Sequence, residues 1–99
     1  MITGITGGLA TVVVGRVNHN TITDPDGILV ADMTEPNMLQ EMLKAAAVVT
    51  NRGGALSHAA IVCTQRGIPF VVGTKTATDL PQGAYIEVDT TKGTVTLLD

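Results

Sequence analysis

The sequence is poor in aromatic side chains, and this limits what the protein can bind. Of its 99 residues 44% are hydrophobic but only 2% are aromatic, with one Tyr, one Phe and no Trp. The core must therefore consist of aliphatic side chains and alanine. Proteins that bind single-stranded nucleic acid use aromatic stacking platforms, and phosphate backbones attract basic proteins. Together with a formal charge of −3, this argues against a nucleic-acid partner.

Cysteine and long apolar runs are also scarce. Cys63 is the only cysteine, so no internal disulfide can form, which is typical of a reducing compartment. No apolar run reaches the roughly 20 residues that span a bilayer, and the first residues lack the regions of a signal peptide. We therefore expect a cytoplasmic protein with no membrane partner. A chain of this length buries one core, so we expect a single domain over residues 1–99.

Acidic residues are missing from the middle of the chain. Residues 42–78 contain four cations and no Asp or Glu, so this stretch carries +4 and the rest carries −7. A cationic middle favours an anionic substrate, although chance alone also explains it in so short a chain.

Strands are expected to outnumber helices. β-Branched and apolar runs separated by turn residues predict strands over residues 12–17, 28–31, 48–50, 70–72, 84–88 and 94–98. A first helix is expected to begin at Thr34 or Glu35 as its cap, with Pro36 in the first turn. Its predicted apolar face consists of Met38, Leu39, Met42, Leu43 and Ala46. The class is mixed α/β.

A second predicted helix carries the most informative side chain. It should begin at Ser57 or His58 and run to Arg66, because Gly67 can adopt the left-handed exit. The amides and dipole at a helix N-terminus attract anions and disfavour positive charge. Imidazole there is favoured in its neutral, nucleophilic form, and a phosphoryl group on it would be stabilised.

Two glycines precede this helix. Gly53 and Gly54 would let a bulky phosphate donor approach closely. A lone histidine at a helix start is more often a solvated or capping residue, however, and a Gly-Gly pair is common in loops. The residues alone leave both interpretations open.

Two sequence segments carry a family resemblance. The run GGALSHAAIV over residues 53–62, followed by GIPFVVG over residues 67–73, resembles the signature of the phosphohistidine swivelling domain. This mobile domain occurs in PEP-utilising enzymes, among them PEP synthase, pyruvate phosphate dikinase, enzyme I of the sugar phosphotransferase system and rifampicin phosphotransferase. Other parts of the family pattern resemble residues 7–17, 28–30 with 34–36, and 83–89 with 93–95.

The resemblance implies a compact β/β/α swivelling domain of the α/β class. His58 would be the phosphoryl carrier, attacking through Nε2, and Thr34 would hold its imidazole by a hydrogen bond. Gly53, Gly54 and Ser57 would shape the loop and helix start around the phosphate. The residues themselves do not choose between the two ring nitrogens.

The resemblance also implies partners. The histidine would carry a phosphoryl group between an ATP-grasp-type nucleotide-binding domain and a PEP/pyruvate or other acceptor domain, in the same chain or in separate subunits. No cofactor is expected on this domain, and Mg²⁺ with ATP or PEP is expected on the partner domains. The chain would not complete a turnover alone.

The sequence departs from the family pattern at two positions, and the first, Thr64, supports an alternative to the carrier role. Many family members have an arginine where this chain has Thr64, and Arg66 lies about 200° around the helix from it. Leu56 stands where plant-type dikinases have a regulatory threonine, so that switch should be absent. The alternative is a non-catalytic interaction or regulatory module that retains the fold.

The remaining candidates are expected to be structural. His58 and Cys63 lie about 140° apart on a helix, so we expect no metal site. Cys63 is expected in the core and His19 in a solvated turn. Arg52 could contact phosphate, although a solvated loop arginine is the more common state. Ser57 is expected to cap its helix. Met33, Met38 and Met42 are expected to fill the core.

Overall fold

The computed structural model describes residues 1–7 and 10–98. Its strands form one mixed sheet in the order β1-β7-β6-β2-β3-β4-β5. In chain order the elements are β1 (Ile2–Thr3), β2 (Val12–His19), β3 (Gly27–Ala31), the 3₁₀ turn η1 (Pro36–Met38), α1 (Leu39–Lys44), β4 (Ala47–Thr50), α2 (His58–Arg66), β5 (Phe70–Val71), the 3₁₀ turn η2 (Ala77–Asp79), β6 (Tyr85–Asp89) and β7 (Thr94–Leu97).

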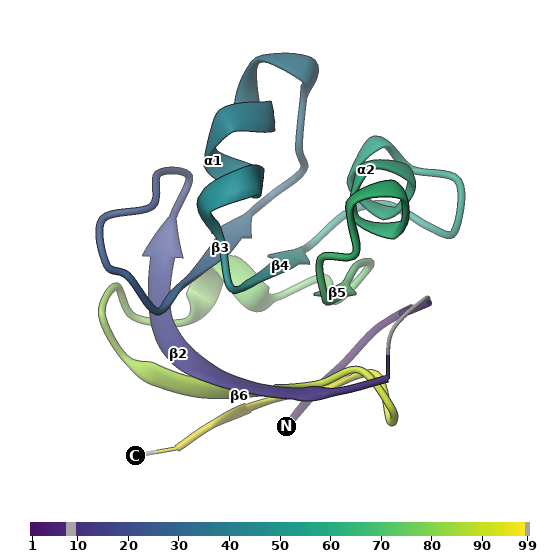
Figure 1. The fold of residues 1–99 in the computed structure, drawn as a ribbon. Helices are drawn as coiled ribbons and strands as arrows, with labels where there is room; N and C mark the ends of the chain where they lie inside the picture. Colours follow the sequence, from purple (N-terminus) through teal and green to yellow (C-terminus); the bar gives the residue numbers. More distant parts are fainter. Residues whose placement is uncertain (8–9, 99) are drawn as a thin grey trace.

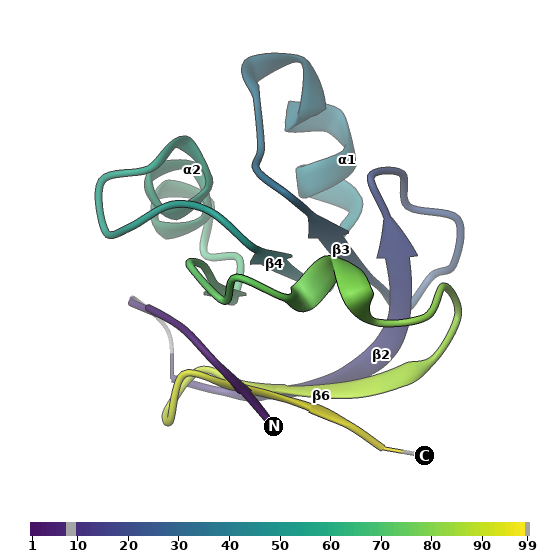
Figure 2. The ribbon, with the colours of Figure 1, turned by 180° about the vertical axis from the view of Figure 1, so that it is seen from behind.

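The sheet has two halves that share strand β2. Strands β2, β3, β4 and β5 pair in parallel, whereas β1, β7, β6 and β2 pair antiparallel. The long β2 curves between the halves, so that the antiparallel half lies beneath the parallel half, with α1 and α2 on the opposite side (Figure 1). The view from behind shows the same three layers (Figure 2). This is the β/β/α arrangement that the resemblance implies.

The central strands β3 and β4 are buried on both faces. Ile28 and Val30 point into the core between the two sheet halves, and Leu29 points into the core beneath the helices. On β4, Val49 points into the core between the sheet halves and Val48 into the core beneath the helices. Burial of both faces explains why these strands are continuous apolar runs without polar alternation.

The predicted strands are present with small shifts at their ends. β2 continues through Asn18 and His19, because these residues pair in parallel with β3. We expected His19 in a turn. The prediction of a solvated His19 is therefore wrong: the residue is half-buried, and its Nε2 lies 2.6 Å from the carbonyl oxygen of Leu80. Strand β1 was not predicted, and residues 8 and 9 of the segment 7–17 that resembles the family pattern lie outside the described part.

The first helix is shorter than predicted. The expected helix is divided into η1 and the six-residue α1, and Glu35 caps η1 without a side-chain hydrogen bond. Of the predicted apolar face, Met42 is fully buried, but Leu43 is 42% exposed and Ala46 lies beyond the helix end. The helix stops at Lys44 because the chain must turn back into β4, and the Ala46 N–H donates to the carbonyl of Gly27 beside that strand.

The second helix is confirmed at both ends. Ser57 is the N-cap of α2, and its Oγ accepts a hydrogen bond from the backbone N–H of Ala60 at 3.3 Å. Gly67 ends the helix in the left-handed conformation, with a φ of 69°. Within residues 1–7 and 10–98 no helix has the length and apolar character needed to cross a membrane.

Candidate functional site

The site lies at the carboxyl ends of two neighbouring parallel strands. Thr34 comes three residues after β3, and the Gly53-Gly54 loop follows β4 and leads into α2. Because β3 and β4 are parallel and adjacent, the loops that leave them emerge at the same sheet edge, where ligands of open α/β sheets bind.

The central contact joins Thr34 and His58. Thr34 Oγ1 lies 2.9 Å from His58 Nδ1, and Thr34 is only 4% exposed. The hydrogen bond implied by the resemblance is therefore present. Nε2 of His58 has no hydrogen-bond partner among the described residues, and the residue is only partly buried. One ring nitrogen is held by the protein while the other remains available.

A pocket of about 210 Å³ opens beside this histidine. It is lined by Met33, Thr34, Arg52, Gly53, Ser57, His58 and Ala59. Among the described residues no carboxylate lines it, whereas one arginine does. Of the four cations in the acid-free stretch only Arg52 reaches the pocket; Lys44, for example, pairs with Glu41 at 3.4 Å.

The N-terminus of α2 contributes polar backbone to the pocket. Ser57 Oγ satisfies one first-turn amide, that of Ala60. The amides of His58 and Ala59 have no hydrogen-bond partner within the described ranges, and both residues line the pocket. Free N–H groups at the positive end of a helix dipole stabilise an anion placed against them.

The two loop glycines are not equivalent. Gly53 has a φ of 113°, and a Cβ there would meet Ser57 Cβ and Oγ at 2.9 Å. Gly54 has no atom within 4 Å of an added Cβ. Gly53 is therefore the residue whose missing side chain permits this loop. Gly73, after β5, packs against the same loop, since a Cβ on it would lie 2.8 Å from the Gly53 carbonyl oxygen.

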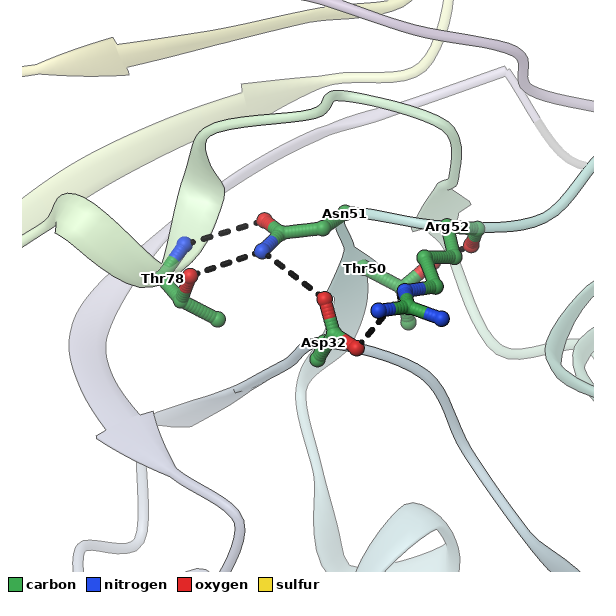
Figure 3. A network of polar contacts seen from close by, with 5 residues as sticks. All are labelled: Asp32, Thr50, Asn51, Arg52 and Thr78. Atoms are coloured by element: carbon green, nitrogen blue, oxygen red, sulfur yellow. Dashed lines mark hydrogen bonds and ion pairs between the residues drawn. The ribbon is translucent and has the colours of Figure 1, made fainter.

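Met33 lies elsewhere than predicted, and Arg52 has a partner that was not predicted. Met33 does not fill the core: it is 47% exposed and lines the pocket, because it follows β3 at the open end of the sheet. Arg52 is exposed but not simply solvated. Its Nε forms an ion pair with Asp32 Oδ2 at 2.8 Å (Figure 3).

Other residues of α2 take no part in the site. Cys63 is fully buried, as predicted, and burial raises the pKa of its thiol to about 12. Thr64 and Arg66 are exposed and do not line the pocket. In the described part of the chain, no three His, Cys, Asp or Glu side chains come together in a way that could hold a metal ion.

Comparison with known proteins identifies the family. Residues 23–93 match the family described as "PEP-utilising enzyme, mobile domain". The chain belongs to this family. The match covers the pocket residues, with His58 at the start of α2.

Relatives and solved structures agree with this assignment. The chain is 47% identical over 93 residues to the phosphoenolpyruvate synthase of Pyrococcus furiosus, covering 93% of this chain but only 11% of that protein. The mobile domain thus spans about a ninth of this relative. The N-terminal domain of Enzyme 1 (Nitrogen) superposes with a TM-score of 0.67 and 30% identity, over 76% of this chain and 32% of that one.

The fold also occurs in a different protein. Aconitase X of Thermococcus kodakaraensis matches with a TM-score of 0.70 at 17% identity, over 99% of this chain and 96% of that chain. This likeness concerns the fold alone. Function must therefore be argued from the residues around His58 and not from the architecture.

Sequence reasoning missed the polar cluster beside the pocket. Asn51 donates through Nδ2 to Asp32 Oδ1 at 3.2 Å and to Thr78 Oγ1 at 2.7 Å, and its Oδ1 accepts from the Thr78 N–H at 3.1 Å (Figure 3). Asp32 and Asn51 each directly follow a buried strand. Polar residues at the ends of two neighbouring parallel strands were the available signal.

Proposed function

We propose that this mobile domain is a phosphoryl carrier and that Nε2 of His58 is the atom phosphorylated. The observation that carries the proposal is the hydrogen bond between Thr34 Oγ1 and His58 Nδ1 at 2.9 Å. It engages one nitrogen of the ring and leaves Nε2 free beside a pocket that no carboxylate of the described residues lines. A buried residue that fixes one ring nitrogen defines the direction in which the other attacks.

The transfer step follows from this geometry. Thr34 Oγ1 accepts a hydrogen bond from Nδ1–H of the neutral ring, so the lone pair remains on Nε2. Nε2 forms a bond to the phosphorus of the donor, and the P–O bond to the leaving group breaks with its electron pair going to the leaving oxygen. In the second step an acceptor oxygen attacks the phosphorus, and the N–P electron pair returns to Nε2.

Negative charge on the transferred group is balanced by the protein backbone. The unpartnered amides of His58 and Ala59 lie at the positive end of α2 and border the pocket. Phosphoryl transfer depends mostly on positioning and charge stabilisation. A small rigid domain with one held imidazole can therefore perform its half of the reaction.

The donor and acceptor sites belong to other domains in this proposal. The described residues offer no ligand set for Mg²⁺, and the chain spans about 11% of a relative named phosphoenolpyruvate synthase. We place Mg²⁺ with ATP or PEP on partner domains, of which one is an ATP-grasp-type nucleotide-binding domain and another binds PEP/pyruvate or a different acceptor. The partners are in the same chain or in separate subunits.

A labelling experiment tests the carrier role. The chain is incubated with ³²P-labelled PEP, or with ATP labelled in each phosphoryl position in turn, and a phosphoenolpyruvate synthase whose own carrier histidine has been replaced. We expect label on the chain that is stable in base and labile in acid. His58→Ala should abolish the label, and His19→Gln, at the only other histidine, should retain it.

The same experiment can refute the proposal. Absence of label with either donor, in a chain shown by circular dichroism to be folded, would leave a non-catalytic interaction module as the better explanation. Equal labelling of wild type and His58→Ala would exclude His58 as the carrier.

A further inference from the structure

The guanidinium of Arg52 is paired through Nε, whereas its terminal nitrogens have no partner among the described residues. Its Nε contacts Asp32 Oδ2 at 2.8 Å, and its terminal nitrogens donate no hydrogen bond within the described residues. An arginine guanidinium has five N–H donors in a rigid fork. The Arg52 side chain is 71% exposed, yet the residue lines the same pocket as His58. The free end of the fork is thus available to a ligand there.

Asp32, the partner of Arg52, is itself held in place. Its Oδ1 accepts from Asn51 Nδ2 at 3.2 Å, and Asn51 is bound on its other side to Thr78 of η2 (Figure 3). The main chain adds a further link, because the Arg52 N–H donates to the Asp32 carbonyl at 2.8 Å. A carboxylate fixed by an amide and by the neighbouring backbone limits the positions that the guanidinium can adopt.

The same two loops carry the reacting histidine. Asp32 lies two residues before Thr34, which holds the ring. Arg52 directly precedes Gly53, where an added Cβ would meet Ser57 at the start of α2. The Asp32–Arg52 ion pair therefore joins the loop that orients the imidazole to the loop that leads into its helix.

We infer that Arg52 binds the phosphoryl group carried on His58, through its terminal nitrogens, and that Asp32 positions it for this. The inference rests on the proposed function, since it concerns the phosphorylated state of the same pocket. A guanidinium binds two phosphate oxygens at once, and such charged hydrogen bonds are stronger than neutral ones. Arg52 is also the one cationic side chain that lines the pocket in the described structure, where a phosphoryl group would bring up to two negative charges.

The test uses a donor that needs no partner domain. Phosphoramidate transfers its phosphoryl group to imidazole: the N–P bond to its amine breaks, ammonia leaves, and a bond to the ring nitrogen forms. The phosphorylation rate of His58 is measured for wild type, Arg52→Ala, Arg52→Lys and Arg66→Ala. Arg66→Ala is the matched control, because it removes the same charge from the other end of α2. Arg66 lies about 12 Å from His58 along the helix axis.

Arg52→Ala should react roughly 10- to 100-fold more slowly, the loss expected from a charged hydrogen bond. Arg52→Lys should be intermediate, since it keeps the charge without the fork, and Arg66→Ala should match wild type. The ³¹P resonance of the phosphorylated chain provides a second measurement. Its pH titration midpoint should be higher in Arg52→Ala than in wild type and Arg66→Ala, because a nearby cation favours the dianion.

The role of Asp32 is tested by a double-mutant cycle. Asp32→Asn should lower the phosphorylation rate of His58 in the wild-type background. It should leave that rate unchanged in the Arg52→Ala background, because Asp32 acts through Arg52. The same change in both backgrounds would show that Asp32 is only structural and overturn its positioning role.

Equal rates and equal titration midpoints for Arg52→Ala and wild type would overturn the role of Arg52 while leaving the carrier proposal intact. If wild-type His58 accepts no phosphoryl group from either phosphoramidate or the partner enzyme, both proposals fail together.

Discussion

Thr34 and His58 are 24 residues apart, yet Oγ1 of the first lies 2.9 Å from Nδ1 of the second. The threonine stands just before a helical segment and is of the type that caps helices. It caps nothing: η1 begins after Glu35 without a side-chain cap, and the Thr34 hydroxyl contacts the histidine instead. The Thr34 hydroxyl thus contributes to the pocket and not to the stability of the adjacent helical segment.

Replacing Thr34 tests that contact. In Thr34→Val the valine side chain has nearly the same shape but no hydroxyl. His58 Nδ1 therefore loses its hydrogen-bond partner, and the ring loses its fixed orientation. We expect phosphorylation of His58 to slow about 10-fold, the value of roughly one hydrogen bond. Thr34→Ser is the matched control, because it keeps the hydroxyl, and should stay within a fewfold of wild type. Equal rates for valine and wild type would remove Thr34 from the site.

The two loop glycines form a natural pair of variants. Gly53→Ala forces a side chain onto a φ of 113° and against Ser57 at 2.9 Å, so we expect a loss of about 1–3 kcal/mol in the free energy of unfolding. Gly54→Ala has open space around the new methyl group and should change stability by less than about 1 kcal/mol. Urea denaturation measures both. Similar losses would contradict the difference seen between these positions.

Ser57 links the loop to the helix. Its Oγ accepts from the Ala60 N–H at 3.3 Å and lies 2.8 Å from the Gly54 carbonyl, to which it donates. Ser57→Ala should cost about 1 kcal/mol of stability, typical of a lost N-cap, while Ser57→Asp should retain the cap. Thermal unfolding provides the measurement. An alanine variant as stable as wild type would show that the cap contributes nothing here.

Cys63 should be chemically inert in the folded protein. Burial raises the pKa of its thiol to about 12, whereas an unfolded cysteine ionises near 8.5. The native thiol should therefore react slowly with iodoacetamide at pH 8, and quickly once the chain is unfolded in urea. Equal rates in the two states would contradict the burial seen in the structure.

The same pKa shift predicts a pH dependence of stability. Because the native pKa is the higher one, the unfolded chain releases the thiol proton first as the pH rises. This contribution to stability is complete below about pH 8.5 and is lost progressively between about pH 8.5 and 12. Cys63→Ala should show a weaker decline over that range in chemical denaturation experiments.

Local patterns in the sequence determined the helix that carries the histidine and most of the strands. Ser57 as cap, Gly67 as exit and the apolar runs of β3 and β4 act through the backbone conformation and burial of a few neighbouring residues, so they could be interpreted without a structure. The first helix was predicted too long, because the turn into β4 overrode the apolar periodicity that continues to Ala46.

The tertiary structure alone decided which distant side chains meet. Parallel pairing of β3 with β4 places Asp32 beside Arg52 and lets Met33 line the pocket, and pairing of β2 with β3 extends β2 to His19. Strand order depends on contacts between residues far apart in the chain, which no local signal encodes. The amino-acid sequence by itself therefore determined that an imidazole stands at a helix N-terminus, and the packing of the strands determined the groups that surround it.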